Sequence, residues 1–400
     1  MTKKEMTQMA LNYGKYGLYD FHLTPEQEEK ALAVYEDSYV IDMLFQGPLS
    51  PYSLEESFSR KIEEKYEPLK TTDPDRYRGK IAGAVLQAAL DGELPEFKQC
   101  WYDSGITAGC RQLETSGGLD DLIKSMGECQ AQFDRFSDWL IKATKADDIV
   151  RAKRENKKAG FLLCQDSFAL GKDLDMIDAL YQYGLRVMQL SYNTQTHVAA
   201  GCYERTKAGV TNFGVKFIQR MNDLGMIVDT GHCSDQTVLD ACELSKTPVI
   251  ASHCCVRSVY PHNRSKGDEA LKAIAQSGGV VGLVAMPNFI HADSHHATMD
   301  HVMDQIDYAV NLCGIDHVGI GTDWPMSEVM ASLVYLRDVL SLQMGFLPGD
   351  GPAEETVEGL TEYRQFINFA RGMVARGYGE DDIKKLLGGN WLRVFREVCG

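Results

Sequence analysis

Residues 213–253 read FGVKFIQRMNDLGMIVDTGHCSDQTVLDACELSKTPVIASH, and this stretch decides the fold that the sequence predicts. It contains two short apolar runs, 225–230 and 248–252, each preceded by an amphipathic segment, 213–224 and 234–244. Apolar runs of this length are typical of buried parallel strands, and amphipathic segments between them are typical of covering helices. The stretch therefore predicts two consecutive units of a parallel sheet with crossover helices.

The same alternation extends through most of the chain on both sides of this stretch. Amphipathic segments recur at residues 268–277 and 301–312. Six further apolar runs have the length of buried strands, at residues 39–45, 105–109, 159–164, 187–192, 279–284 and 317–323. Eight strands alternating with helices are typical of a closed parallel barrel. We therefore expect an α/β protein with a (β/α)8 TIM-type barrel.

The amino-terminal part adds a helical segment and an insertion. We expect residues 1–38 to be largely helical, because Thr24 is a favourable N-cap and Pro25 a favourable first helical residue. Residues 51 to about 100 follow the first strand and are charged and interrupted by prolines, which predicts an insertion. Since the strand–helix alternation continues from residue 104 onward, the prediction is a single barrel domain over residues 1–400.

Composition and charge restrict the class of protein. The chain has 400 residues, 44% hydrophobic and 24% charged, which allows a large core and excludes a disordered or fibrous protein. Its formal charge of −16 disfavours binding to nucleic acid or to anionic membranes. No apolar stretch approaches the roughly 20 residues of a transmembrane helix, and no signal peptide is apparent. Eleven cysteines without a disulfide-like framework favour reduced thiols, so we expect a cytoplasmic protein.

Polar residues follow three of the predicted strands, at the end of the barrel where such folds carry their chemistry. They are His232, His253 and Asp323. Two imidazoles and a carboxylate can bind one divalent ion, Zn²⁺ above all but also Fe²⁺ or Mn²⁺, and leave positions for water and substrate. The alternative is that each side chain only satisfies backbone groups in a loop. That role is the commoner one for a single histidine, but it explains a convergence of three residues less well.

Most other histidines are weaker candidates. A polar segment that we interpret as solvated surface, with weak metal capture as the alternative, contains His291, His295, His296 and His301. His197 follows another predicted strand, and both a substrate contact and a surface position stay open for it. Two further histidines are interpreted as structural, His22 and His317.

Several longer motifs resemble the membrane dipeptidases, also called renal dipeptidases. They run in order from about residue 104 to the C-terminus and include GLRVMQLSYN (184–193), MNDLGMIVDTGHCSD (221–235), PVIASHCCVR (248–257), HVGIGTD (317–323) and LGGNWLRVF (387–395). The resemblance implies a (β/α)8 barrel that is usually a dimer and that hydrolyses dipeptides at a two-zinc centre. We therefore expect a homodimer or a larger homo-oligomer.

The resemblance also implies roles for individual residues. His232 and His253 match the family's two later histidine ligands, and Asp323 matches its final aspartate. Arg257 matches the arginine that binds the substrate's carboxylate, a role that suits the planar guanidinium group.

The chain departs from the family's pattern at several of its other ligand positions. The family's His-x-Asp pair falls on Leu44, Phe45 and Gln46, and its bridging glutamate falls on Gln165. Leucine cannot bind a metal, and a neutral glutamine amide leaves the repulsion between two cations uncompensated. The sequence therefore predicts one divalent ion instead of two, held by the two histidines and the aspartate, with Gln165 or Gln46 as further donors.

The family's histidine that stabilises the tetrahedral intermediate falls on Tyr192. Its hydroxyl can donate to a developing oxyanion, and the alternative is an aromatic side chain whose hydroxyl is merely satisfied. The predicted catalytic residues are Tyr192, Asp323 and His232. The residues predicted to orient a small carboxylated substrate are Arg257, Asn193, Gln165 and Arg264.

The predicted function is a dipeptidase-type, metal-dependent hydrolase acting on a small carboxylated amide or dipeptide-like substrate. One alternative is a lyase or decarboxylase that uses the same pocket, which the loss of carboxylates favours. Another is a catalytically silent homologue that binds a ligand. The presence of four polar residues expected to converge on one pocket argues against the silent homologue, because such groups are costly to desolvate. They are His232, His253, Asp323 and Arg257.

Overall fold

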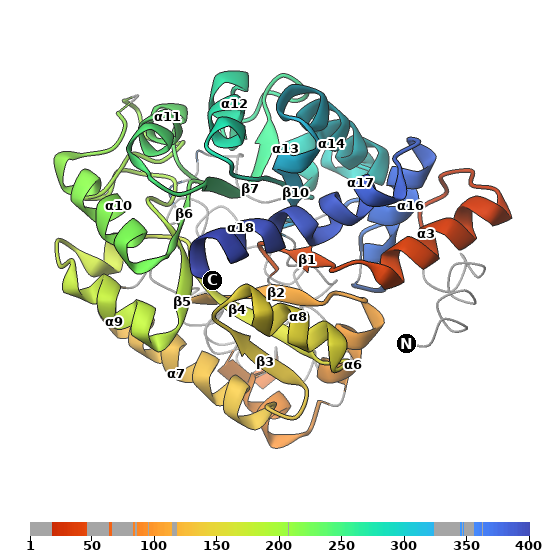
Figure 1. Ribbon diagram of the computed structural model, residues 1–400, viewed down its shortest axis with the longest axis horizontal. Coiled ribbons are helices and arrows are strands. Elements are labelled where there is room, and N and C mark those ends of the chain that lie inside the picture. Colours follow the sequence, from red (N-terminus) through yellow and green to blue (C-terminus); the bar gives the residue numbers. More distant parts are fainter. Residues whose placement is uncertain are drawn as a thin grey trace.

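The computed structural model describes residues 18–45, 64–65, 83–84, 86–94, 96–113, 118–206, 208–323, 345, 347, 356–361 and 363–400. Within these residues a ring of eight parallel strands forms the centre of the molecule (Figure 1). Their spatial order follows the chain: β1 (Ile41–Asp42), β2 (Ala108–Leu113), β4 (Lys158–Cys164), β5 (Leu185–Gln189), β6 (Ile227–Asp229), β7 (Val249–Val256), β9 (Val281–Leu283) and β10 (Val318–Ile320).

The first and last strands close the ring through backbone hydrogen bonds. The Met43 N–H donates to the Ile320 carbonyl at 3.1 Å, and the Asp323 N–H donates to the Leu44 carbonyl at 3.1 Å. All eight predicted strands are found, and the predicted TIM-type barrel is confirmed. Strand β2 ends later than its apolar run, because Arg111 and Gln112 continue the pairing with β4.

Two short strands were not expected from the sequence. Strand β3 (Leu140–Ala143) pairs with the first half of β4, and β8 (Ser265–Lys266) pairs with the end of β7. Strand β3 has four residues and is only partly buried, and β8 consists of two polar residues. Neither therefore contains the longer apolar run that indicates a buried strand. Such strands form because a neighbouring strand offers free backbone groups, which a local pattern does not reveal.

The predicted end of β7 at residue 252 is also corrected. The strand continues to Val256, and its pairing with β9 shifts between Ala251 and Cys254. Ser252 and His253 lie at this irregularity. β-bulges often occur beside active sites, where they change the direction of a side chain.

Helices surround the barrel in Figure 1. The helices predicted from the sequence are confirmed, with bounds α10 (Asn212–Leu224), α11 (Asp235–Leu244), α12 (Asp268–Gln276) and α14 (Met299–Cys313). The remaining helices of the described residues are α3 (Pro25–Asp37), α6 (Glu96–Asp103), α7 (Leu119–Arg135), α8 (Ala146–Arg154), α9 (Asp175–Tyr183), α13 (Pro287–Ile290), α16 (Asn368–Ala375), α17 (Glu380–Lys384) and α18 (Asn390–Cys399). Short helical turns are η2 (Phe168–Leu170), η3 (Ser294–His296), η4 (Ile315–His317), η6 (Tyr363–Ile367) and η7 (Lys385–Gly389).

Helix α3 begins as the sequence predicts. Thr24 caps it through a capping box with Gln27, and Pro25 is its first residue. The helix is attached to the rest of the fold by a buried ion pair in which Arg371 donates to Glu28 at 2.6 and 2.8 Å. Residues 1–17 lie outside the described residues, as does most of the insertion at 51–100. Within that insertion the described residues 86–91 are helical, as is the start of α6.

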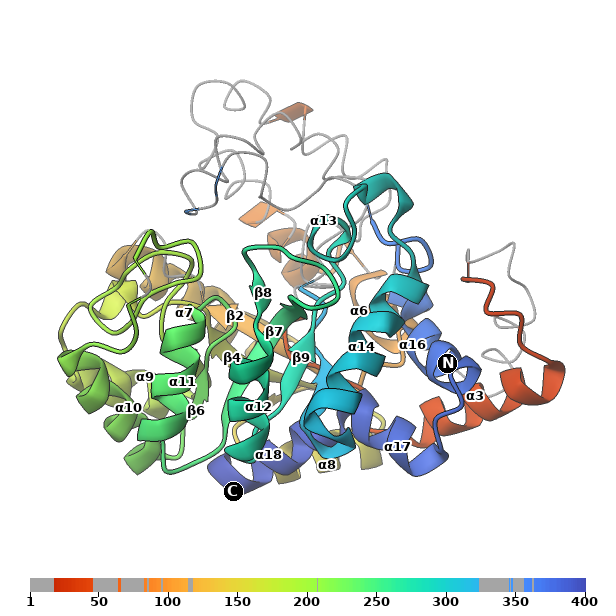
Figure 2. The same ribbon diagram turned by 90° about the horizontal axis from the view of Figure 1, so that it is seen from above.

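The C-terminal helix α18 covers the amino-terminal end of the barrel. Asn390 donates to the Ile315 carbonyl and Arg393 to the Gly278 carbonyl, both at 2.8 Å, and these carbonyls lie just before β10 and β9. In Figure 2, α18 lies at one end of the barrel, with β8 and α13 toward the other. The carboxyl ends of the strands therefore remain for a functional site.

All eleven cysteines are free thiols, as predicted. Among the described residues no helix is long and apolar enough to cross a membrane.

The buried Lys158, the first residue of β4, makes the stability of the protein depend on pH. Its ammonium group donates to the Ile106 carbonyl at 2.6 Å, and burial lowers the pKa of Lys158 to about 7. In the unfolded chain this pKa is about 10.4. The folded protein therefore binds fewer protons between these two values, and the free energy of unfolding rises with pH across this window.

Replacing Lys158 by methionine removes this pH dependence. We expect the stability of the wild type relative to Lys158→Met to increase by roughly 2–4 kcal/mol between about pH 6 and about pH 10. Urea denaturation of both proteins at several pH values measures this difference. A difference that stays constant over the range would mean that Lys158 remains charged in the folded protein.

Candidate metal centre

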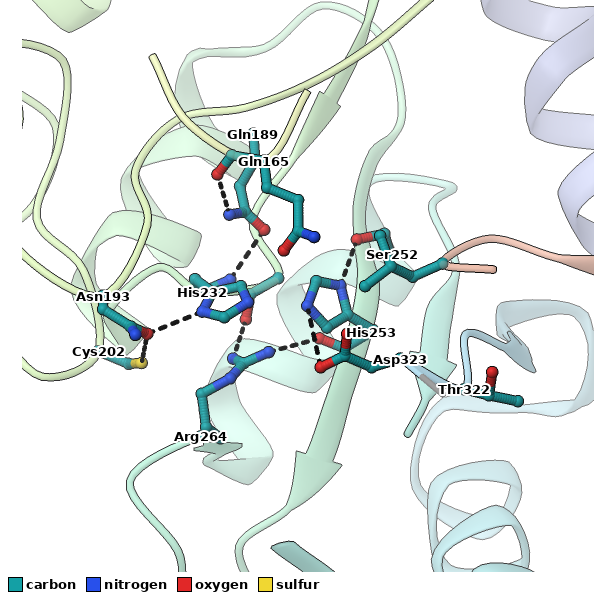
Figure 3. A network of polar contacts seen from close by, with 12 residues as sticks. Gln165, Gln189, Asn193, Cys202, His232, Ser252, His253, Arg264, Thr322 and Asp323 are labelled. Atoms are coloured by element: carbon teal, nitrogen blue, oxygen red, sulfur yellow. Dashed lines mark hydrogen bonds and ion pairs between the residues drawn. The ribbon is translucent and has the colours of Figure 1, made fainter. Parts of the chain in front are cut away.

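Three side chains predicted as ligands meet at the carboxyl end of the barrel. His232 follows β6, His253 lies at the irregularity of β7, and Asp323 follows β10. Their potential ligand atoms all lie within 4.8 Å of one another. In the part of the chain that the structure describes, no other group of three or more His, Cys, Asp or Glu side chains meets this condition. Figure 3 shows the two imidazoles and the carboxylate facing a common centre.

One ring nitrogen of His232 has a hydrogen-bond partner among the described residues, and the other has none. Its Nδ1 lies 2.7 Å from Asn193 Oδ1, and its backbone N–H donates to Gln189 Oε1 at 3.0 Å. Because an amide oxygen only accepts, Nδ1 carries the proton and Nε2 keeps its lone pair. Nε2 is buried and has no hydrogen-bond partner among the described residues. The ring of Tyr192 stacks on this imidazole with a centroid distance of 3.8 Å.

His253 is held in the same way through a different residue. Its Nδ1 lies 2.8 Å from Ser252 Oγ, and the Ser252 hydroxyl in turn donates to Asp229 Oδ2 at 2.6 Å. Its Nε2 is likewise buried, has no hydrogen-bond partner in the described part of the chain, and lies 3.9 Å from Asp323 Oδ2. Metal-binding histidines generally use their second nitrogen in this manner, which fixes the ring.

Both imidazoles are neutral at ordinary pH. Burial lowers the pKa of His232 and of His253 well below the usual value, and the nearby charge of Arg264 lowers both further. A neutral imidazole has the lone pair that a metal ion requires. Burial also raises the pKa of Asp229, whereas hydrogen bonds from Ser252 and Gly231 oppose this rise.

The residue before Asp323 is held in place by Asp42 of β1. Thr322 donates its backbone N–H and its hydroxyl to the carboxylate of Asp42, at 2.9 and 2.6 Å. Asp323 itself has a left-handed backbone with φ of 52°, and Asn193 has one with φ of 55°. Asp and Asn tolerate this conformation better than other residues with a Cβ, and such backbones concentrate at functional sites. Burial raises the pKa of Asp42 to about 7.

Two further predicted residues complete the site. Gln165 Oε1 is buried without a hydrogen-bond partner among the described residues, and its amide points toward the imidazoles in Figure 3. Arg264 is 1% exposed and donates to the Gly231 carbonyl at 2.7 Å, while its Nε has no partner in the described part of the chain. Unpartnered polar atoms at one buried place indicate a site that is completed by a ligand.

Arg257 lies differently from what the resemblance implies. Its guanidinium group donates to Asp235 at 2.5 Å and to the Ser265 carbonyl at 2.5 Å, and its side chain is 45% exposed. It makes these bonds at the surface, whereas Arg264 lies in the network around the imidazoles (Figure 3). Of these two arginines, Arg264 is therefore the one that lies within the network around the imidazoles.

Two positions at which the family has further ligands lie differently in this chain. Leu44 is fully buried and belongs to an apolar cluster with Cys110 and Leu163. A leucine packed in the core offers no donor for a second ion. Gln46, expected as a further donor, lies outside the described residues.

The other histidines do not join this site. His317 Nδ1 lies 2.9 Å from the Gly279 carbonyl oxygen, which agrees with the structural role predicted for it. The side chains of His22 and His296 are largely exposed and pair with neighbouring aspartates, and His197 is also exposed. Of the other histidines in the polar segment, His295 is exposed. The ring centroids of His291 and His301 lie 4.4 Å apart.

Four supporting residues were missed from the sequence. They are the side chains that fix the ligands or the residues beside them: Asp42, Gln189, Asp229 and Ser252. All four are polar residues inside or beside otherwise apolar strands. A buried polar residue needs a partner, so this pattern is the signal that could have identified them.

Comparison with known proteins finds relatives in sequence and in fold. The sequence matches the family model described as Membrane dipeptidase (Peptidase family M19) over residues 28–343. Dipeptidase tcpJ of Claviceps purpurea is 27% identical over 344 residues, which cover 84% of this chain and 72% of that protein. Dipeptidase 3 of Rattus norvegicus is 26% identical over 383 residues, which cover 94% and 68%. An amidohydrolase from Pseudomonas aeruginosa has the same fold, with a TM-score of 0.71 at 24% identity over 92% of this chain and 98% of that one.

Proposed function

This chain belongs to the membrane dipeptidase family of metal-dependent, dipeptidase-type hydrolases, and we propose that it hydrolyses a small carboxylated amide or dipeptide-like substrate at a site with one metal ion. The observation that carries the proposal is the meeting of two open imidazole nitrogens with one carboxylate. His232 Nε2, His253 Nε2 and the Asp323 carboxylate lie within 4.8 Å of one another. Both nitrogens are buried without a hydrogen-bond partner among the described residues.

These donors suit a divalent ion. Two neutral imidazoles and one carboxylate are the ligands that Zn²⁺ takes in many hydrolases, and Fe²⁺ or Mn²⁺ accept the same set. We propose Zn²⁺ as the resident ion, with the Gln165 amide oxygen as a further donor. A divalent ion at this position supplies Lewis acidity, which polarises a substrate carbonyl and makes water more acidic.

The protein's own residues supply binding and proton transfer. Arg264 binds the substrate's carboxylate, since its charged group is held rigidly beside the ligands and guanidinium matches carboxylate geometry. Asp323 accepts the proton of the attacking water, because its carboxylate lies 3.9 Å from His253 Nε2 and a carboxylate is a suitable general base. Tyr192, stacked on His232, donates its hydroxyl proton toward the oxyanion that develops on the amide carbonyl. Asp323 then passes this proton to the leaving nitrogen as the C–N bond breaks, so the products are a carboxylate and an amine.

The proposal of a single ion rests on charge and on packing. The family's bridging carboxylate is Gln165 here, and the histidine of its His-x-Asp pair is Leu44. An amide carries no charge to offset the repulsion between two dications a few ångströms apart. A second ion would also lose one imidazole ligand.

Asp323→Asn tests the proposed site while keeping its shape. We expect wild-type protein purified without chelator to contain about one equivalent of metal and to release amino acids from a panel of dipeptides. The amide variant loses the negative charge and the proton acceptor, so we expect its kcat/KM to fall by about 10²–10³-fold. Mass spectrometry of the metal and a ninhydrin assay of the products measure both quantities.

Labelled water separates hydrolysis from other chemistry at the same pocket. Hydrolysis places one oxygen of H₂¹⁸O in the new carboxylate, and a lyase or decarboxylase does not. Turnover without label would contradict the proposed reaction. Turnover that is equal in Asp323→Asn and in the wild type would reject the assigned site.

A further inference from the structure

Ser252 connects a buried carboxylate to one of the proposed metal ligands. Its hydroxyl lies 2.6 Å from Asp229 Oδ2 and 2.8 Å from His253 Nδ1. All three residues are completely buried. On the premise that His253 binds a metal as proposed above, we propose that Ser252 is a positioning residue. Its hydroxyl bridges the Asp229 carboxylate and His253 Nδ1, and this bridge, called here the Ser252 relay, fixes the imidazole tautomer that can bind the ion.

The direction of the hydrogen bonds follows from counting protons. A hydroxyl has one proton, and Ser252 donates it in a hydrogen bond to the Asp229 carboxylate. Its oxygen can then only accept from His253, so Nδ1 carries the ring proton. A neutral imidazole protonated on Nδ1 has its lone pair on Nε2, the atom that faces Asp323.

The second oxygen of Asp229 stabilises this arrangement. Asp229 Oδ1 accepts the backbone N–H of Ser252 at 2.7 Å and that of Gly231 at 3.0 Å. Burial raises the pKa of Asp229, but these two backbone donors and the Ser252 hydroxyl oppose the rise and favour the ionised carboxylate, which accepts and cannot donate. The hydroxyl proton of Ser252 is therefore directed to Asp229 and not to His253.

The backbone around Ser252 is shaped for this contact. Pairing between β7 and β9 shifts between Ala251 and Cys254, which places Ser252 at the irregularity. A Cβ at Gly282 or Gly321 would lie 2.0 or 1.8 Å from the Ser252 carbonyl oxygen. Glycine at these two positions lets β9 and β10 approach the Ser252 carbonyl, while the hydroxyl reaches Asp229.

The two ligand histidines thus differ in their support. His232 is held by the neutral amide of Asn193, and only His253 is backed by a carboxylate through a hydroxyl. Supporting residues of metal ligands change metal affinity about 10–100-fold when they are removed. The same range is expected for the Ser252 relay.

Two variants remove the relay in different ways. In Ser252→Ala, His253 loses the acceptor for its ring proton, and we expect Zn²⁺ affinity to fall about 10–100-fold. In Asp229→Asn, the amide oxygen retains the backbone N–H groups and the amide N–H₂ donates to Ser252. The hydroxyl must then donate to His253 Nδ1, which moves the ring proton to Nε2 and blocks metal binding at least as strongly.

Thr230→Val is the matched control. Thr230 is also fully buried, and its hydroxyl donates to the Ile250 carbonyl at 2.7 Å without touching either histidine. The variant loses one buried hydroxyl beside the same strands, so it shows how much the loss of such a hydroxyl alone changes stability and Zn²⁺ affinity. We expect its Zn²⁺ affinity to stay within about threefold of the wild type.

The experiment measures the ring tautomer of His253 and Zn²⁺ affinity separately. Long-range ¹H–¹⁵N spectra of metal-free, histidine-labelled full-length protein give the tautomer, and competition with a chromophoric chelator gives the Zn²⁺ dissociation constant. We expect an Nδ1–H tautomer in the wild type and in Thr230→Val, a mixture in Ser252→Ala, and an Nε2–H tautomer in Asp229→Asn. Thermal unfolding shows that each variant is folded at the temperature used.

The outcomes separate this inference from the proposed function. If the wild type binds no Zn²⁺ but the tautomer changes as expected, the metal site is wrong and the relay is correct. If the wild type binds Zn²⁺ and the variants keep its tautomer and affinity, the relay is overturned. An Nε2–H tautomer in the wild-type protein would also overturn it.

Discussion

Replacing His232 by alanine is expected to remove the bound metal ion and to lower kcat/KM for dipeptide hydrolysis by about 10³-fold or more. His232 supplies one of two imidazole nitrogens in a set of three ligand atoms, so its loss leaves too few donors for tight binding. Metal-ion catalysis contributes several kcal/mol to such reactions, and each ~1.4 kcal/mol corresponds to a factor of ten in rate. Metal content and steady-state kinetics of the variant measure the effect.

His317→Ala is the control for this prediction. His317 is a partly buried histidine just before β10, and its ring bonds to the Gly279 carbonyl and lies outside the ligand group. We expect the variant to keep its metal and most of its activity. Equal losses in the two variants would mean that His232 acts only through the stability of the fold.

Replacing Arg264 by methionine is expected to lower kcat/KM for a dipeptide by about 10²–10³-fold. Arg264 is 1% exposed and has a buried Nε without a partner among the described residues, so it can bind a carboxylate away from water. Truncating one partner of a buried charge pair costs about 2–5 kcal/mol, which corresponds to this range. The wild type should strongly prefer a dipeptide over the same dipeptide with an amidated C-terminus, and the variant should lose that preference.

Arg257→Met is the matched variant. Arg257 carries the same charge a few residues away, but it is half exposed and already paired with Asp235. Exposed ion pairs contribute little, so we expect a decrease of less than about tenfold. A larger loss of carboxylate preference in Arg257→Met than in Arg264→Met would restore the assignment that the sequence resemblance implies.

The fold could be predicted because its signals are local. Each barrel strand is a short apolar run, and helices such as α10 and α14 are amphipathic segments of ordinary length. Strands β3 and β8 could not be predicted, because they depend on the free edges of β4 and β7. The extension of β7 through His253 was missed for a similar reason, since its shifted pairing with β9 is a tertiary feature.

The meeting of the three candidate ligands was predictable, and the residues that support them were not. His232, His253 and Asp323 follow predicted strands, and the barrel fold alone brings such positions together. The contact between Ser252 and Asp229 depends instead on side-chain directions in neighbouring strands. The choice between Arg257 and Arg264 likewise depends on the path of the segment between β7 and β8, and the sequence contains no signal for that path.

The departures from the family's ligand pattern form a consistent set. Leu44 is packed into the core, and the same β1 segment now holds the residue beside Asp323 through Asp42. Gln165 keeps an oxygen at the site without a charge. These residues reduce the negative charge of the site, and the proposal of a single ion rests on this reduction.

An anomalous difference map from crystals of the zinc-loaded protein, recorded at the zinc absorption edge, tests the central claim most directly. The account predicts one strong peak per chain, within bonding distance of His232 Nε2, His253 Nε2 and the Asp323 carboxylate. Two peaks at the barrel mouth, or no peak between these three side chains, would contradict it.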